Sequence, residues 1–267
     1  MLPRSIEPAL AVDVIDAQSA LAHEAVRVEN LSKRYRRYAY RNLTLKGRVF
    51  DFLRGRRDQF VEFDAVRDVS FAVRNGQMVA IIGRNGSGKS TLLRVLAGIA
   101  QPDAGTVTVR GRVSPLLELG AGFSPELTGR RNVYLYGALL GLSRREISAQ
   151  LPAILAFSEI GEFLDTPVKH YSSGMYLRLA FAVAAHVDPD VLLLDEVLAV
   201  GDAAYQEKCL ARMREFRRQN KTIVLVTHQA ASVQELCDRA LLIDRGVLIA
   251  DGPPDQVLAT YHRLLAL

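Results

Sequence analysis

The sequence predicts an α/β fold with a parallel sheet at its centre and a helical insertion. Three short apolar runs, at residues 79–82, 191–194 and 222–226, are typical of parallel strands that are covered on both faces. Each run is followed by a helix-compatible segment, as expected for a sheet built from strand–helix units. The block from about residue 124 to 187 is dominated by helical patterns and interrupts this alternation. We therefore expect it to form an inserted helical subdomain.

The other elements follow from periodicity and turn residues, in chain order. Residues 1–24 are expected to be a flexible extension. Alternation predicts strands at 24–31 and 65–71, and the sequence Arg74-Asn75-Gly76-Gln77 predicts a tight turn after the second of them. The remaining predictions are a helix at 91–97, a strand at 106–110, a helix at 203–218, a hairpin with strands 240–243 and 247–249 around Asp244-Arg245-Gly246, and a terminal helix at 254–265.

The turn between residues 79–82 and the next helix carries a phosphate-binding pattern. Residues Gly83–Thr91 fit G-x-x-x-x-G-K-[ST], in which the glycines let consecutive N–H groups point at an anion. The helix that follows adds the positive end of its dipole. A chance match would not be expected to combine strand, glycines, Lys-Ser and helix in register. Lys89 is expected to reach the β- and γ-phosphates of a nucleoside triphosphate, and Ser90 to ligate Mg²⁺. The predicted nucleotide-binding residues here are Gly83, Asn85, Gly86, Ser87, Gly88, Lys89, Ser90 and Thr91.

The positive charge of the chain is concentrated in one segment. The 267 residues have a formal net charge of +5, but residues 33–57 hold ten bases and one acid, which leaves 24 bases against 28 acids elsewhere. This argues against a protein that coats nucleic acid and favours one cationic contact surface. No apolar run is long enough to span a membrane, and the first residues do not resemble a secretion signal. Cys209 and Cys237 are expected to be buried thiols in a reducing cytosol.

The basic segment forms an insert over about residues 36–60. Within it Leu45, Val49, Phe52 and Leu53 fall on one face of a helix, with arginines beside that face. Such a cationic amphipathic helix can lie on anionic headgroups or against a partner at the bilayer surface. An ordinary surface helix packed on its own domain would show the same pattern, so the residues alone leave both interpretations open.

Polar residues follow two of the predicted parallel strands. Ligands of parallel α/β sheets bind at the carboxyl ends of the strands, where Asp195, Glu196 and His228 stand. Asp195 could hold Mg²⁺, and Glu196 could act as the general base for an attacking water. His228 could hold the γ-phosphate or the water. In isolation each would more often be a solvated strand end, but the phosphate-binding pattern upstream favours the catalytic interpretation.

A further motif, Tyr171-Ser172-Ser173-Gly174-Met175, precedes the Asp195-Glu196 strand and is expected to open a helix at 177–186. It resembles the Leu-Ser-Gly-Gly-Gln signature of the ATPase subunits of ABC transporters, and the resemblance extends over nearly the whole chain from about residue 24. The resemblance implies an ABC-type P-loop ATPase with a RecA-like core, an antiparallel β subdomain and the inserted helical subdomain. It also implies hydrolysis of ATP with Mg²⁺, in an ATPase domain spanning residues 25–253.

The same resemblance implies that the site is shared between two copies. In the family, the signature closes on the ATP that a second copy holds, which here would involve Ser172, Ser173, Gly174 and Met175 and implies a homodimer. Asp202 matches the loop that crosses between the two sites, and His228 matches a switch histidine. Tyr35 resembles the aromatic residue that stacks on the adenine ring.

Three stretches together narrow the resemblance. They are the Tyr171–Met175 motif, the sequence from Leu117 to Phe123, and the sequence from Leu194 to Asp202. In combination they resemble ATPases that export bacterial surface polysaccharides such as O-antigen, teichoic acid, capsule or galactan. The resemblance implies a separate transmembrane permease, present in two copies, and a peripheral position on the cytoplasmic face of the inner or plasma membrane. The cargo is expected to be a lipid-linked polysaccharide.

The chain departs from the wider family at the expected contact with the membrane subunit. ABC ATPases usually have a glutamine near residues 118–119, whereas this chain has Glu118 and Leu119. Glu118, Leu119, Gly120 and Phe123 are nevertheless expected to contact the membrane subunit. The basic insert resembles a helix that these exporters place at the membrane surface, which favours the membrane interpretation. Because the sequence stops at Leu267, at the end of the C-terminal helical segment 254–267, no carbohydrate-binding domain is expected.

Two other functions remain as alternatives. One is a soluble ABC-type ATPase that acts on nucleic acid or ribosomes through the arginine-rich segment. The single ATPase cassette and the few bases outside that segment argue against it. The other is an ABC ATPase for another cargo, such as a drug, peptide or lipid, which the stretches 117–123 and 171–175 argue against.

Overall fold

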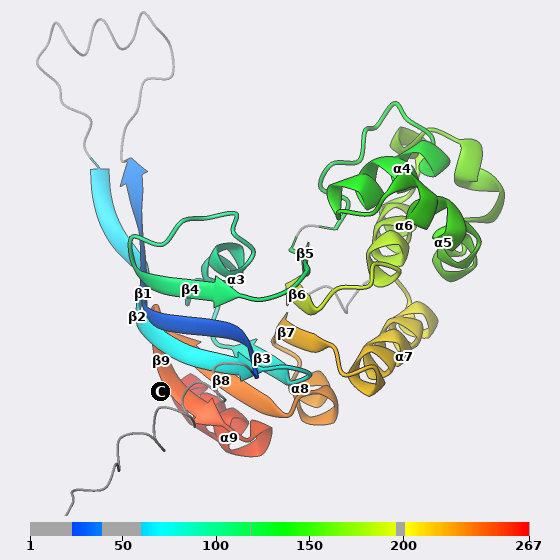
Figure 1. Cartoon of the computed structure of the whole chain (residues 1–267). Helices are drawn as coiled ribbons and strands as arrows, with labels where there is room; N and C mark the ends of the chain where they lie inside the picture. The colour runs from blue at the N-terminus through cyan, green and yellow to red at the C-terminus, as the bar shows by residue number, and fades with distance from the viewer. Residues whose placement is uncertain (1–22, 39–59, 118, 196–200, 267) are drawn as a thin grey trace, which may run out of the picture.

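The structure is a computed structural model that describes residues 23–38, 60–117, 119–195 and 201–266, and it is built around a six-stranded sheet (Figure 1). The strand order is β5-β6-β7-β3-β8-β9, and all neighbouring pairs are parallel except β8 and β9. The strands are β3 (Met78–Ile82), β5 (Val113–Leu116), β6 (Val191–Asp195), β7 (Thr222–Val226), β8 (Arg239–Asp244) and β9 (Val247–Gly252). The three predicted parallel strands and the late hairpin are confirmed.

Strand β3 divides its side chains between two hydrophobic cores. Met78, Ala80 and Ile82 belong to one core, and Val79 and Ile81 belong to the other. Successive side chains of a strand point to opposite faces, so this division means that the sheet is covered on both sides. All five residues are buried, which accounts for the unbroken apolar run in the sequence.

A second, antiparallel sheet covers one face of the central sheet. Its order is β2-β1-β4, and its strands are β1 (Glu24–Tyr38), β2 (Phe60–Arg74) and β4 (Ala104–Val109). Apolar residues of β1 and β2 share a core with Val79 and Ile81 of β3 and with helix α3 (Lys89–Leu96). The antiparallel β subdomain that the resemblance implied is therefore present, and it lies beside α3 (Figure 1).

A helical lobe lies on the side of the molecule away from the antiparallel sheet in Figure 1. It consists of α4 (Gly129–Leu139), α5 (Arg144–Ser158), the 3₁₀ turns η1 (Gly161–Asp165) and η2 (Val168–His170), and α6 (Ser173–Ala185). Helix α5 begins with a capping box in which the Ser143 hydroxyl accepts from the Glu146 amide and the Glu146 carboxylate accepts from the Ser143 amide. These helices fall within the block that the sequence predicts to be helical.

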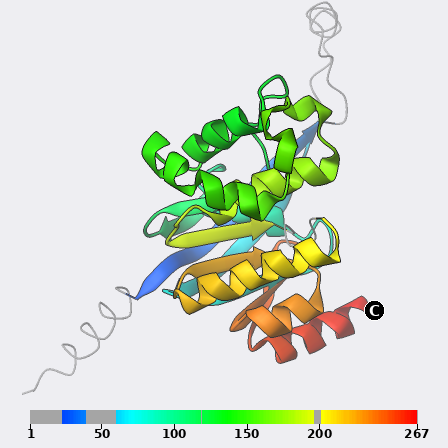
Figure 2. The same ribbon diagram turned by 90° about the vertical axis from the view of Figure 1, so that its right-hand side faces the viewer.

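Three further helices follow strands of the central sheet: α7 (Ala203–Arg218), α8 (Ala230–Leu236) and α9 (Pro254–Leu265). Helix α7 runs across the sheet in Figure 2 and buries four side chains in the first core. These are Tyr205, Cys209, Met213 and Phe216. Burial raises the pKa of both cysteine thiols, Cys209 and Cys237, to about 12, so both remain protonated at neutral pH.

The structure corrects two predicted boundaries of the antiparallel sheet. β1 continues to Tyr38 instead of ending at Leu31, and β2 begins at Phe60 instead of at residue 65. Both ends of the predicted insert at 36–60 are therefore strand. Charged pairs link the two strands in this additional part of the β1–β2 ladder. Arg34 Nε donates to Asp64 at 2.8 Å, and Arg36 Nε donates to Glu62 at 2.9 Å. The predicted amphipathic helix with Leu45, Val49, Phe52 and Leu53 lies outside the described residues.

A third boundary also differs, because the signature helix begins at Ser173 and not at residue 177. The small residues before 177 have low helix propensity, but Ser172 caps the helix and starts it earlier. In the parts of the chain that the structure describes, no helix combines the length and the apolar character of a membrane span.

Candidate functional site

The predicted phosphate loop connects β3 to α3 and is held by Lys89. The Lys89 ammonium donates to the main-chain carbonyls of Gly83 and Arg84, both at 2.9 Å. Its side chain is almost fully buried, with only 6% of the residue exposed. Burial of a cation requires partners of this kind. The positive charge is therefore fixed beneath the loop.

Two glycines fit this loop tightly between neighbouring strands. Gly83 and Gly88 have φ angles of 150° and 106°, a region that other residues rarely adopt. A Cβ atom at Gly88 would overlap the carbonyl oxygen of Ala65 in β2, and one at Gly83 would overlap that of Ile243 in β8. At Gly86, by contrast, no heavy atom of the described residues lies within 4 Å of the corresponding position. The loop therefore packs closely against neighbouring strands at Gly83 and Gly88 and has open space beside Gly86.

The loop also contains a polar atom that fits a bound anion. Among the described residues, the buried Ser87 hydroxyl has no hydrogen-bond partner. Buried hydroxyls normally have one, so this oxygen is suited to a ligand or a water at the loop. Helix α3 begins at Lys89 directly after Gly88, which provides no side-chain cap, so its first N–H groups are also available to phosphate oxygens.

A cavity of about 520 Å³ lies over the start of α3. The phosphate-loop residues around it are Gly86, Gly88, Lys89, Ser90 and Thr91. Tyr35 of β1 lines the same cavity, so the structure brings the predicted adenine-stacking residue together with the predicted phosphate site. The cavity is large enough for a nucleotide.

Four residues of this cavity were not predicted from the sequence: Phe63, Asp64, Ala65 and Arg245. Phe63 pairs directly with Tyr35 across the β1–β2 ladder, so the two rings lie on the same face, with centroids 6.1 Å apart and a 35° angle between them. They form an aromatic floor on which a flat base could stack. Only the register of the two strands reveals this pairing, and the predicted strands stopped short of it.

The predicted catalytic residues follow the parallel strands at one edge of the sheet. In the strand register Ile81 of β3 lies beside Val226 of β7, and Val226 lies beside Asp195 of β6. The phosphate loop, His228 and Asp195 therefore follow three adjacent strands, each with polar groups at its carboxyl end. Glu196 lies outside the described residues.

The donor set at this edge suits Mg²⁺. The Ser90 hydroxyl at the start of α3 and the Asp195 carboxylate at the end of β6 are oxygen ligands, which Mg²⁺ prefers. Within the described residues no group of three or more His, Cys, Asp or Glu side chains could hold a metal by itself. A metal here would need additional oxygens, as phosphates and water provide.

The signature residues belong to the helical lobe and lie apart from this cavity. The Ser172 hydroxyl caps α6 by accepting from the Met175 amide at 3.2 Å. Among the described residues that line the cavity none comes from Ser172–Met175, and Figure 1 shows α6 in the lobe away from α3. Ser172 and Ser173 are exposed. One chain therefore presents two separate halves of the expected site.

Asp202 links the lobe to the sheet domain. Its carboxylate caps α7 by accepting from the Tyr205 amide at 3.0 Å and accepts from Arg178 of α6 at 2.6 Å. The capping amide is the main reason that the pKa of Asp202 lies below its usual value, and Arg178 lowers it further. Asp202 therefore stays ionised near neutral pH.

The structure changes the interpretation of the expected contact with a membrane subunit. Phe123 is only 8% exposed. Its ring centroid lies 5.4 Å from that of Tyr136 and 4.9 Å from that of Tyr176. Gly120 is also buried, and its carbonyl accepts from the Tyr176 hydroxyl at 2.8 Å. Phe123 and Gly120 thus anchor this loop to α4 and α6 and do not present a contact surface. Leu119 is half-buried, and Glu118 lies outside the described residues.

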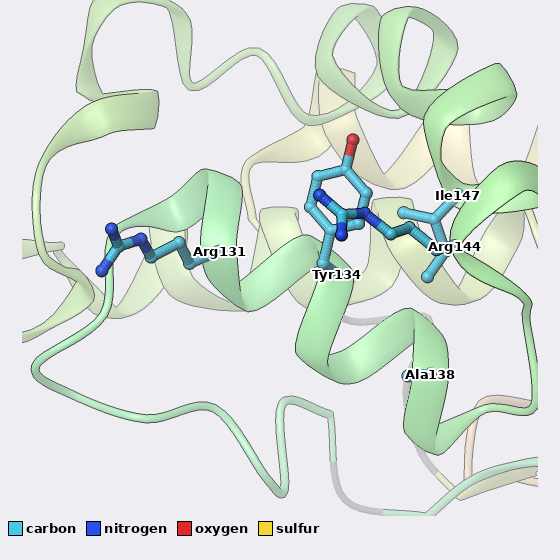
Figure 3. Close-up of a pocket in the computed structure, with 5 residues that line it drawn as sticks. All are labelled: Arg131, Tyr134, Ala138, Arg144 and Ile147. Atoms are coloured by element: carbon cyan, nitrogen blue, oxygen red, sulfur yellow. The ribbon is translucent and has the colours of Figure 1, made fainter.

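A second cavity of about 390 Å³ opens between α4 and α5. Figure 3 shows the residues that line it: Arg131, Tyr134, Ala138, Arg144 and Ile147. The Tyr134 hydroxyl lies 3.1 Å from the Ser148 hydroxyl. None of the described residues that line this cavity has a predicted role in nucleotide binding.

Comparison with known proteins identifies relatives of this chain. Residues 66–199 match the family model described as ABC transporter. The chain is 54% identical over 203 residues to the ABC transporter protein AbcA of Aeromonas salmonicida, covering 76% of this chain and 66% of AbcA. It is 43% identical over 250 residues to the O-antigen export system ATP-binding protein RfbB of Klebsiella pneumoniae, covering 91% of this chain and 100% of RfbB.

A third relative is the teichoic acids export ATP-binding protein TagH of Shouchella clausii, 40% identical over 232 residues. This match covers 87% of the present chain and 63% of TagH. The chain therefore spans slightly less than two thirds of AbcA and TagH and the full length of the Klebsiella protein.

Solved structures share the fold. A dimeric ATP-binding cassette in a post-hydrolysis state with ADP and phosphate matches with a TM-score of 0.67 and 21% identity, covering 86% of this chain and 98% of that one. An ATP-binding subunit of an ABC transporter matches with a TM-score of 0.69 and 24% identity, covering 89% and 93%. The predicted fold class is confirmed.

Proposed function

Because the chain belongs to the ABC transporter family, we propose that it is the ATP-hydrolysing subunit of a system that exports a bacterial surface polysaccharide. The observation that carries the proposal is the cavity in which Tyr35 and the phosphate loop from Gly86 to Thr91 meet. Relatives named for O-antigen and teichoic acid export support a polysaccharide cargo, with a lipid-linked polymer as the expected form.

In this proposal each residue at the sheet edge has a separate role in binding or hydrolysing ATP. Lys89 and the N–H groups at the start of α3 bind the phosphates, and Tyr35 stacks on the base. Ser90 and Asp195 would hold Mg²⁺, which supplies charge neutralisation at the phosphates. Glu196 takes a proton from a water while that water's oxygen bonds to the γ-phosphorus and the bond to the ADP oxygen breaks. His228 positions the γ-phosphate.

The proposal also requires a second copy of the chain. Ser172–Met175 at the start of α6 would bind the γ-phosphate side of the ATP that the other copy holds. Asp202, fixed by Tyr205 and Arg178, would place its loop between the two sites. Hydrolysis would then open the dimer, and this movement would drive transport.

A separate membrane subunit completes the proposed assembly. Two copies of a membrane-spanning permease would contact the loop with Glu118 and Leu119, which Phe123 and Gly120 anchor to the helical lobe. The basic insert at 36–60 would lie on the membrane surface, since its net positive charge suits anionic headgroups. The ATPase would thus be peripheral, at the cytoplasmic face of the membrane.

The variant Glu196→Gln tests the proposal. Without the general base the chain should bind ATP but not hydrolyse it, and gel filtration with ATP should show a dimer that ADP does not produce. Glu207→Gln, which changes an exposed glutamate on α7, is the control and should not accumulate a dimer. A Glu196→Gln variant that binds ATP and remains monomeric would rule out the shared site.

A further inference from the structure

One cationic side chain of the nucleotide cavity has no assigned role. Arg245 lies in the turn between β8 and β9 and lines the same cavity as Tyr35 and the phosphate loop. It comes from a part of the chain more than a hundred residues beyond the loop. Its presence in the cavity therefore results from folding and not from the phosphate-binding motif.

The β8–β9 turn is tied directly to the phosphate loop. The Gly246 amide donates to the Ser87 carbonyl at 2.9 Å, and the Arg67 amide of β2 donates to the Gly246 carbonyl at 2.7 Å. A Cβ atom at Gly246 would lie 2.9 Å from the Ala65 carbonyl oxygen, the same oxygen that a Cβ at Gly88 would overlap. Turn, β2 and phosphate loop are therefore in close contact, so the position of Arg245 relative to the loop is fixed by main-chain contacts.

The backbone of Arg245 is in a sparsely populated conformation. Its φ angle is +46°, in the left-handed region that a non-glycine residue adopts at a cost. Asparagine or glycine would adopt this conformation more easily. An arginine at such a position is consistent with a use for its side chain.

The charge of Arg245 is available to a ligand. Its side chain is 91% exposed, and its Nε lies 4.0 Å from the Asp244 carboxylate, which is too long for a hydrogen bond. Lys89, the other cation of the cavity, already donates to two loop carbonyls. A guanidinium presents several donors in a plane and binds two oxygens of one phosphate more readily than an ammonium does.

We infer that Arg245 is a nucleotide-binding residue, whose guanidinium binds phosphate oxygens of the nucleotide held by the phosphate loop of the same chain. This inference rests on the proposed function, because it requires that the cavity takes a nucleoside di- or triphosphate. It adds to the site a contact from the β8–β9 turn, which faces the phosphates from the side of β2.

The test compares nucleotide affinities of the parent chain and four variants by isothermal titration calorimetry, with ADP and with adenosine as a probe that has no phosphate. Arg245→Asn removes the positive charge, and asparagine tolerates the left-handed backbone conformation at this position. Arg245→Lys keeps the charge. Arg67→Ala is the matched control, since Arg67 is an exposed arginine whose amide holds the same turn but whose side chain does not line the cavity.

Arg245→Asn should weaken ADP binding about tenfold, the usual size of one charge-assisted hydrogen-bonded contact, and should leave adenosine binding within about twofold. Arg245→Lys should regain most of the ADP affinity, and Arg67→Ala should bind like the parent chain. The loss in Arg245→Asn should shrink at high salt. Thermal unfolding of each variant checks that the fold is retained.

Lys89→Ala distinguishes a failure of this inference from a failure of the proposed function. If Lys89→Ala loses ADP affinity and Arg245→Asn does not, the inference about Arg245 is wrong and the proposed function stands. An equal loss of ADP and adenosine in Arg245→Asn would also overturn the phosphate contact, because it would place the arginine on the base. If Lys89→Ala binds ADP normally, the proposed function itself fails.

Discussion

Lys89 and the glycines around it hold the phosphate loop in its shape. The ammonium holds the Gly83 and Arg84 carbonyls, while Gly83 and Gly88 let the loop pass between β2 and β8. The same tight fit makes the loop sensitive to single methyl groups.

Two substitutions in this loop should differ sharply in stability. Gly88→Ala should lower the free energy of unfolding by at least about 2 kcal/mol, because its methyl group meets the Ala65 carbonyl at a strained φ angle. Gly86→Ala shares the positive φ angle but meets no atom within 4 Å in the part of the chain that the structure describes, and should cost only about 1 kcal/mol. Urea unfolding without nucleotide measures both. Equal losses in the two variants would contradict the close packing of Gly88 against β2.

Among the elements, the β1–β2 ribbon connects the nucleotide site to the basic insert. The ladder continues until Tyr38 pairs with Phe60, and Tyr35 pairs with Phe63 within it. Cation–π contacts add to it, since the Arg36 guanidinium lies 4.8 Å from the Phe60 ring centroid. The aromatic floor of the cavity therefore lies on the same two strands that lead into the insert.

Deleting residues 43–57 should spare basal ATP hydrolysis and impair transport. Tyr38 and Phe60 stay paired at the end of the ladder, so residues 39–42 and 58–59 can close the connection without moving Tyr35. The basal rate of the purified chain should stay within about twofold of the parent, since neither the phosphate loop nor the strand ends change. Polysaccharide export in cells should fall. A loss of ATPase activity in the isolated subunit would show that the insert serves the nucleotide site instead.

The elements also show which features sequence patterns can predict. The central strands were predictable because burial on both faces leaves continuous apolar runs, as at Leu192–Leu194. The far ends of β1 and β2 were not, because charged pairs such as Arg34 with Asp64 hold an exposed ladder and leave no apolar alternation.

The site residues divide in the same way. The spacing of the motif predicts Lys89 and Ser90, whereas Phe63 and Arg245 reach the cavity only through strand pairing and turn packing. These contacts join distant parts of the chain, so no local pattern records them. At Phe123 the local pattern was misleading. The motif there predicts a contact surface, but the neighbouring aromatic side chains bury the Phe123 ring.

On the scale of the whole molecule, the phosphate loop and the signature motif lie in different parts of one chain. The phosphate loop and Tyr35 line a cavity beside the antiparallel sheet, while Ser172 and Ser173 are exposed on the helical lobe. A symmetric dimer would place each signature on the other copy's nucleotide, since a two-fold interface makes every contact twice. Each of the two sites would then contain residues from both chains.

Mixing two inactive variants tests this shared site most directly. Lys89→Ala lacks the phosphate-binding cation, and Ser172→Arg blocks the signature, so each homodimer should be inactive. A mixed dimer has one site in which both defects coincide and one site in which the loop and the signature are intact. Random mixing in equal amounts should therefore restore about a quarter of the parent ATPase rate. If each chain instead completes its own site, both variants should be inactive alone and the mixture should show no activity at any ratio.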